Sequence, residues 1–340
     1  MPKIVAKVMS LEALGKMGIS VTGAVDYLGT GAIEVPIFDR EILDIVRRTS
    51  VALNRMPQLP ATGHPHRYLE QTAVATASAV DPRNIAATAS GPTRVERPAF
   101  IKAIVAQSNL SLFDRDVTEQ QGQFPSVVAK DIDDIISAIE ILRAQMLWNG
   151  NDTSLAAPTQ LGWCGLLTQI TQQFTVAPGS SIIDAIKTEV ATIMANQTYK
   201  VTPTAIITNP LAADYIDQEA KAAKIELKDI VIGGGVTVES LSTQAGRLPI
   251  ITEAFMPIDT ASNYGFSAPP TGNRNYYVAI LTEEHIEIPV ISGKEYNPNP
   301  RLFQLGLTGN LAGQFVGVKF DAVIAKGASY AHAIGVIQRP

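Results

Sequence analysis

The stretch that decides the fold is residues 125–150, PSVVAKDIDDIISAIEILRAQMLWNG. Its apolar residues recur at helical spacing, so we predict one long amphipathic helix with a single buried stripe. Pro125 fits the first turn of a helix, and Asn149-Gly150 is a stop signal. A helix of about 23 residues spans roughly 35 Å. The predicted stripe is Val128, Ile132, Ile135, Ile136, Ile139, Leu142 and Met146, and the predicted solvent face carries Lys130, Asp131, Asp133, Asp134, Glu140 and Arg143.

Composition narrows the class of protein. Of 340 residues, 46% are hydrophobic and only 17% are charged, which fits either a large core or a surface that is partly hidden in subunit contacts. The net charge of −5, without a basic tract, argues against strong nucleic-acid binding. Cys164 is the single cysteine, which excludes an internal disulfide and is expected to be a small core residue. We predict no signal peptide and no membrane span.

The chain before the long helix lacks a core of its own. Residues 1–55 have weak periodicity broken by glycines, with a short helix expected at 39–52, so we predict an arm that rests on another surface. Within 56–112, strand-like stretches at 67–76 and 93–112 flank a connector at 77–92 made of small residues. Such a long connector implies a function or disorder, and two strands joined by it form an extended hairpin.

The chain after the long helix alternates helices and strands and then becomes mostly strand. Residues 161–170 are predicted to be a turn into a short apolar strand, and Ser180 or Ser181 to cap a helix that ends near Asn196. A buried strand at 204–208 precedes a third helix at 211–223, an order typical of α+β or α/β folds. The remaining strands are expected near 248–255, 276–282, 286–291, 301–307, 315–324 and 331–337.

Motifs for cofactors or metals are weak. Gly233-Gly234-Gly235 follows a strand-like run, but Val238 stands where a dinucleotide fingerprint needs glycine, and 236–238 is strand-like. We therefore expect a loop or bulge there. His64-Pro65-His66 is a poor chelate without a carboxylate cluster beside it, and His332 is expected to be a satisfied core or interface histidine. His285 completes the four histidines.

Catalytic constellations are equally weak. Asp131, Asp133 and Asp134 would face different directions on a helix and suit a solvated surface better than acid–base chemistry. The sequence has no nucleophile elbow and no zinc-protease motif, and the glycosylation-like triplets at 151–153 and 196–198 come without a secretion signal. We therefore predict no catalytic, cofactor-binding or metal-binding residues, and no enzyme.

The order of these segments resembles the major capsid proteins of tailed bacteriophages, the fold first described in the Hong Kong phage. The best-matching pieces are 147–152, 162–167 and 204–210. The resemblance implies an α+β capsid fold with an N-terminal arm at 1–55 and an extended loop, the E-loop, at 56–112. It also implies a peripheral P-domain at 113–165 and 286–340, which carries the long spine helix, and an axial A-domain at 166–285.

The resemblance also implies a function. The chain would be a structural major capsid protein that assembles through itself, as pentamers and hexamers, into an icosahedral shell around double-stranded phage DNA. Portal, scaffold and decoration proteins are possible further partners, DNA would make only weak non-specific contact, and no membrane is involved. The virion would be the final location, after assembly in the host cytoplasm. Lys102, the one lysine of the loop's return strand, is too little to assign a covalent cross-link.

Two alternatives stay open. An encapsulin-type nanocompartment shell has the same fold and would hold a cargo enzyme in place of DNA. A cytosolic α/β enzyme of unknown chemistry, with a site built from residues set aside above, belongs to a different class and would behave as a soluble monomer.

Overall fold

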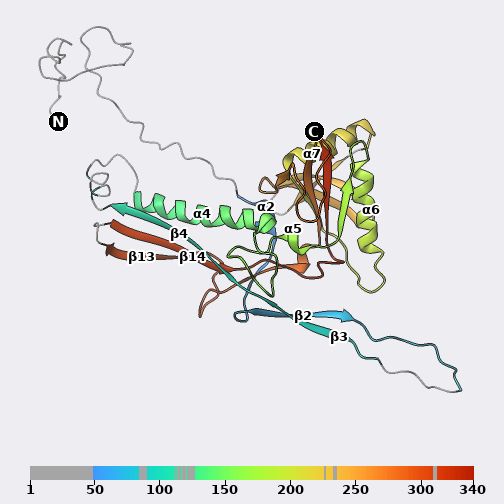
Figure 1. Cartoon of the computed structure of the whole chain (residues 1–340), viewed down its shortest axis with the longest axis horizontal. Coiled ribbons are helices and arrows are strands. Elements are labelled where there is room, and N and C mark those ends of the chain that lie inside the picture. Colours follow the sequence, from blue (N-terminus) through green and yellow to red (C-terminus); the bar gives the residue numbers. More distant parts are fainter. Residues whose placement is uncertain are drawn as a thin grey trace, which may run out of the picture.

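The predicted long helix is present as α4 (Val127–Asn149), a single 23-residue helix that lies along a three-stranded part of a sheet (Figure 1). The computed structural model describes residues 49–340 apart from 84–89, 112, 114–115, 117–119, 121–126, 226, 233–235 and 309–311. Pro125, the expected first residue of the helix, therefore lies outside the described residues. So does most of the arm, including most of the short helix expected at 39–52.

The buried stripe of α4 is rotated slightly from the predicted one. Ile135 and Ile139 are buried as expected, and Ile132 packs against the same core. Leu142 was predicted to be buried but is 41% exposed, and Arg143 was predicted on the solvent face but is almost fully buried. Arg143 follows Ile139 by one helical turn, so its side chain points to the sheet, where Asp321 is its acidic partner. Leu142 lies one residue away from this line and is partly exposed.

The sheet beneath α4 joins strands from both ends of the chain. Among the described residues it has six strands, in the order β1-β12-β14-β13, with β15 paired to β12 and β4 paired to β14. Gly317 of β14 faces the helix, and a side chain there would collide with Ile135 and Ile139. The strands are β1 (Gln58–Pro60), β4 (Lys102–Ser111), β12 (Ile286–Val290), β13 (Arg301–Thr308), β14 (Ala312–Asp321) and β15 (Ile324–Ala325).

A second sheet, with eight described strands, has the order β5-β16-β11-β6-β9-β8-β7, with β10 paired to β11. Alternate residues of its central strands serve two cores. Ile206 and Val278 face the helices α6 and α7, whereas Ile207 and Ala279 face the core that α4 shares. The elements are β5 (Gln173–Val176), α6 (Ile182–Met194), β6 (Ala205–Thr208), α7 (Pro210–Ala222), β7 (Lys228–Ile232), β8 (Val236–Thr243), β9 (Gly246–Thr252), β10 (Ile258–Asp259), β11 (Arg274–Leu281) and β16 (Ala333–Arg339).

The caps of α6 and α7 follow the sequence signals. Ser181 accepts a hydrogen bond from the backbone of Asp184, and Glu219 of α7 accepts hydrogen bonds from the backbone N–H groups of Ile182 and Ile183. Asn209 caps α7, with Pro210 as its first residue. Both helices were therefore predicted correctly in kind and place.

Residues 161–170 were expected to be a turn into a short strand; the first part is a loop, but the strand is instead a short helix, α5 (Leu166–Gln169), so that part of the prediction was wrong. A short apolar run does not distinguish a buried helix from a buried strand. The helical turn buries Leu166 and Leu167 together, and Gln169 donates hydrogen bonds to the carbonyls of Cys164 and Val323.

Two glycines let the loop close on the end of α4. A Cβ on Gly150 would stand 2.1 Å from the carbonyl oxygen of Trp163, and one on Gly165 would stand 2.3 Å from that of Trp148. This close approach brings together two of the sequence pieces that carried the resemblance, 147–152 and 162–167.

The pairing of strands differs from the expected segment boundaries at both ends. In the arm, α2 (Val51–Arg55) buries Ala52 and Leu53 in the core and is fixed by the buried carboxylate of Glu253. Strands β1 and β4, expected with the extended loop, belong to the sheet under α4. Strand β16, expected with the peripheral domain, lies inside the eight-stranded sheet, where it pairs with β11 from Arg274 to Ile280.

No helix in the described part of the chain is both long and apolar enough to span a membrane.

Candidate assembly surfaces

A two-stranded hairpin projects from the body of the molecule, away from α4 (Figure 1). Strands β2 (His66–Ala73) and β3 (Thr93–Ala99) pair with each other, and among the described residues neither belongs to a larger sheet. Eight residues at about 3.3 Å each give β2 a length of roughly 26 Å. The expected hairpin flanks are confirmed, with the second one ending at Ala99 before β4 begins.

The far part of the hairpin is apolar but exposed. Leu69 is 71% exposed, and Val74 and Val80 are also exposed. Residues 74–80 have small or hydroxyl side chains, carry no charge and belong to no strand among the described residues, although the backbone N–H of Thr76 donates to the Ser90 hydroxyl. An extended backbone with free donors and acceptors can pair with another chain. We name residues 74–83 and 90–92 the hairpin tip.

A groove of about 630 Å³ lies between the end of α4, β4 and the loop before α5. None of the residues that line it is charged. Two of its lining leucines are exposed: Leu161, on the loop, is 91% exposed, and Leu142 of α4 is 41% exposed. We call this the spine groove, and its lining includes Ala103, Ile104, Leu142, Gln145, Met146 and Leu161.

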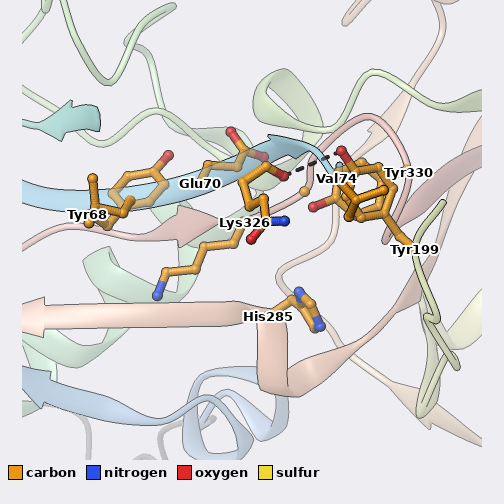
Figure 2. Close-up of a pocket in the computed structure, with 10 residues that line it drawn as sticks. Tyr68, Glu70, Val74, Tyr199, His285, Lys326 and Tyr330 are labelled. Carbon is orange, nitrogen blue, oxygen red and sulfur yellow. Dashed lines mark hydrogen bonds between the residues drawn. The ribbon is translucent and has the colours of Figure 1, made fainter. Parts of the chain in front are cut away.

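Strand β2 touches the body through aromatic side chains, at Tyr68 and, closer to the hairpin tip, where Tyr199 reaches it (Figure 2). The Tyr199 hydroxyl donates to the carbonyl oxygen of Thr72 at 2.8 Å, and the carbonyl oxygen of Gln71 lies 3.3 Å from it. The Tyr199 ring stacks on Tyr330, with ring centroids 4.0 Å apart. Lys326 lies 5.7 Å from the centre of the Tyr68 ring. A cavity of about 330 Å³ separates the rest of β2 from the body here.

A buried cluster of charges joins α4 to β14. Arg143 donates from Nε to Oδ2 of Asp321 at 2.7 Å and from Nη1 to Glu140 at 2.5 Å. Lys319 lies 3.4 Å from Glu140, and burial, aided by the charge of Arg143, lowers its pKa. Charges this deep need partners, so the cluster fixes how α4 sits on the sheet.

Lys102 has a structural partner. Its ammonium group donates to Oδ2 of Asp152 at 2.7 Å and also to the carbonyl oxygen of Gln160. Burial raises the pKa of Asp152, but hydrogen bonds from Lys102, Thr159 and Thr153 outweigh it and leave the pKa below its usual value. Lys102 therefore ties β4 to the loop that borders the spine groove.

His285 lies near His332, since, after burial, its charge helps to lower the pKa of His332, whereas His64 and His66 make separate contacts. His332 is buried, accepts from the backbone N–H of Thr282 and donates to the carbonyl oxygen of Lys326, which confirms the expected core role. Burial lowers its pKa to about 4. His66 accepts from the backbone N–H of Thr62, and burial lowers its pKa. His64 packs edge-on against Phe100.

The other candidates also take structural places. Asp131 accepts a hydrogen bond from Ser108, whereas Asp134 pairs with Lys130, so the aspartates point different ways. Cys164 is buried, and burial raises the pKa of its thiol to about 11. Gly233-Gly234-Gly235 lies outside the described residues, but its flanks, β7 and β8, pair with each other, so a strand follows it as expected. No group of three or more potential metal ligands gathers in the described part of the chain.

Sequence reasoning missed the spine groove and the two tyrosines, Tyr199 and Tyr330, that meet β2. Leu161 is an unremarkable leucine in sequence, and only its place beside α4 makes it notable. Tyr199 and Tyr330 lie far apart in the chain, so no local spacing could have paired them. The clearest available signal was the exposed small-residue connector, which located the hairpin but not its contacts.

The sequence matches no protein-family model and no curated protein sequence. Solved structures do match. The holo-SrpI encapsulin complex from Synechococcus elongatus PCC 7942 matches with a TM-score of 0.61 at 10% identity, over 87% of this chain and 90% of that one. The head structure of Helicobacter pylori bacteriophage KHP40 matches with a TM-score of 0.62 at 9% identity, over 96% and 99%. The capsid of a native GTA particle matches with a TM-score of 0.59 at 14% identity, over 94% and 99%.

These likenesses establish the fold. The chain has the α+β Hong Kong phage-type capsid fold, and the match extends over nearly its whole length. The fold predicted from segment order is therefore confirmed. At 9–14% identity the likeness carries the architecture alone.

Proposed function

We propose that this chain is the major capsid protein of a tailed bacteriophage, a structural subunit that builds a closed shell around double-stranded DNA. The observation that carries the proposal is the projecting hairpin, whose strands have no other sheet partner among the described residues. An isolated hairpin is marginal in water, so a second molecule is the natural source of the missing contacts. The shared fold with phage and GTA capsids supports the same role.

The spine groove is the surface that we assign to the hairpin tip of a neighbouring copy. The tip of the same subunit points away from α4 (Figure 1), so it does not reach its own groove. The chemistry of the two surfaces agrees: the tip is uncharged over residues 74–80, and the groove has an uncharged lining with Leu142 and Leu161 exposed. Gln145 brings an amide to the groove, which can pair with an extended backbone.

The division into an arm, E-loop, P-domain and A-domain is part of the proposal, with boundaries revised by strand pairing. We assign β1 and β4 to the P-domain with α4, because they lie in its sheet. We assign β16 to the A-domain with β5 to β11, for the same reason. The E-loop then comprises residues 61–101, with β2 and β3 as its flanks, and the arm shortens to the residues before α2.

We assign the chain no catalytic role and no cofactor, and expect pentamers and hexamers of one subunit. Closed symmetric assemblies are the usual result of such self-complementary contacts. A net charge of −5 implies only weak, non-specific contact with packaged DNA. Portal, scaffold and decoration proteins are the expected further partners, and the virion, assembled in the host cytoplasm, the expected location.

A nanocompartment shell is the second candidate function. The encapsulin match favours it, because that structure aligns as well as the phage head does, with TM-scores of 0.61 and 0.62. A phage capsid would enclose DNA, whereas a nanocompartment shell would enclose a cargo enzyme. A cytosolic enzyme remains the proposal of a different class, and it predicts a monomer.

Purification followed by light scattering and negative-stain microscopy tests the proposal, with any neighbouring scaffold or protease gene co-expressed. We expect closed particles. Nuclease-resistant DNA inside them would support the phage capsid, and a co-purifying enzyme inside them would support the nanocompartment. A monodisperse monomer under every condition would refute both shell functions.

A further inference from the structure

The strand β2 loses its regular pairing shortly before it becomes the hairpin tip. The register with β3 shifts between Gln71 and Ala73, so Thr72 has no residue opposite it. Such a bulge bends and twists a strand and releases its backbone groups from the ladder. The carbonyl oxygen of Thr72 is the group that accepts the Tyr199 hydroxyl. Tyr199, in the loop after α6, therefore contacts the hairpin at this bulge.

Tyr199 is itself held in place from two sides. The side chain of Asn196 accepts a hydrogen bond from the backbone N–H of Tyr199, and the Tyr199 ring stacks on Tyr330 at an angle of 12°. Tyr330 is positioned by Gly327, whose φ is +67° and where a Cβ would stand 2.8 Å from the Tyr330 ring. The two stacked rings, which we call the aromatic column, thus connect the turn before β16 to β2 through the Tyr199 hydroxyl (Figure 2).

Beyond Tyr199, β2 meets the body where Lys326 lies 5.7 Å from the centre of the Tyr68 ring, and a cavity lies beside these contacts. The cavity of about 330 Å³ lies between β2 and the body, with Leu69 and Val74 among its lining residues. Because this space is not filled by packing, few contacts decide where the strand points. A small rotation at the bend becomes a large displacement at the tip, since the tip extends well beyond Ala73.

We propose that Tyr199 and Tyr330 are positioning residues that set the direction of the hairpin before a second subunit binds. The proposal rests on the shell function proposed above and adds to it a device for regulating the same hairpin. Setting the direction beforehand reduces the ordering cost of association. The angle between neighbouring subunits then depends on this aromatic column, and so does the curvature of the shell.

The first test uses hydrogen exchange, followed by mass spectrometry, on the unassembled subunit. In Tyr199→Phe, which loses only the hydroxyl, and in Tyr330→Ala, which loses the stack, we expect amides of β2 and β3 to exchange at least threefold faster. Two matched controls should exchange as wild type does. Tyr330→Phe keeps the ring, and Tyr215→Phe loses a comparable bond to the Pro340 carbonyl far from the hairpin. Circular dichroism checks that each variant is folded.

The second test measures the diameters of assembled particles by microscopy. We expect Tyr199→Phe to give a broader distribution than wild type and Tyr215→Phe to match wild type. Unchanged exchange in both Tyr199→Phe and Tyr330→Ala would overturn the proposal, and so would faster exchange with an unchanged diameter distribution. If the wild type forms no particles, the shell function fails instead, and exchange alone decides whether the column holds the hairpin.

Discussion

Arg143 of α4 and Asp321 of β14 form an ion pair withdrawn from solvent, with 2.7 Å between Nε and Oδ2. Nη2 of Arg143 and Oδ1 of Asp321 have no hydrogen-bond partner among the described residues. The pair therefore stabilises one placement of the helix without satisfying all of its own polar atoms. A buried ion pair contributes little more to folding stability than an apolar pair of similar volume would. We therefore expect the main effect of Arg143 and Asp321 to be that they specify where α4 lies on the sheet.

Replacing one member of the pair should cost much more than replacing both. We expect Arg143→Met to lower the free energy of unfolding by about 3–5 kcal/mol, because Asp321 would stay buried without its partner. The double variant Arg143→Met/Asp321→Leu should recover most of this loss. Urea unfolding of the unassembled subunit measures both. A double variant as unstable as the single one would show that the pair itself holds the helix.

The two faces of α4 should respond differently to truncation. Ile139→Ala should destabilise the subunit by about 2–5 kcal/mol, since the residue is 1% exposed and its loss leaves a cavity. Leu142→Ala should cost under about 1 kcal/mol, because that side chain already faces the spine groove. Denaturant midpoints decide this, and equal losses would place Leu142 in the core.

Acid should destabilise the subunit through His332. Its pKa is lowered to about 4 in the folded state from about 6.5 in the unfolded one, so the unfolded chain binds more protons between these values. The contribution of neutral His332 to the free energy of unfolding is therefore fully present above pH 6.5. It falls by on the order of 3 kcal/mol as the pH falls toward 4. The thermal midpoint of His332→Gln should depend less on pH in this window than that of wild type. Ile286→Val is the control, a core variant without a titrating group, and it should keep the wild-type slope.

The hairpin tip should be needed for assembly and not for folding. Replacing residues 77–92 by a short Gly-Ser turn should leave a cooperatively unfolding subunit, because the described part of this segment lacks contacts with either core. Stable particles should not form, as measured by sedimentation. Loss of cooperative unfolding would place the segment in the core, and normal particles would make it a dispensable loop.

A charge in the spine groove should separate assembly from stability in the same way. We expect Leu161→Asp to leave the unfolding midpoint within about 0.5 kcal/mol of wild type, because the side chain is 91% exposed, and to abolish particles. Val231→Asp is the matched control, since Val231 is 72% exposed on β7, at the edge of the other sheet. Normal particles from Leu161→Asp would exclude the groove from the subunit interface.

The elements that could be predicted are those whose signal is local. Helical periodicity located α4, α6 and α7, and the small-residue connector located the hairpin. The errors come from partners distant in sequence: Arg143 is buried because Asp321, 178 residues away, lies opposite it. Likewise, Gln169 of α5 donates a hydrogen bond to the carbonyl oxygen of Val323, 154 residues away, a contact that no local pattern shows. The hydrogen bond from Tyr199 to Thr72 could not be predicted for the same reason, because the two residues are 127 positions apart and no local pattern marks either one.

The ten-residue register between β4 and β14, from Lys102 with Asp321 to Ser111 with Ala312, has a consequence for how the chain becomes folded. The eight-stranded sheet is formed largely from residues that lie between these two strands. During synthesis β4 is therefore made long before its partner β14, so one of its edges has no strand to pair with until nearly the whole chain has been made. Four of the six described strands of this sheet, β12 to β15, lie after residue 285, and contacts this distant in sequence slow folding, so we expect the pairing of β4 with β14 to form late.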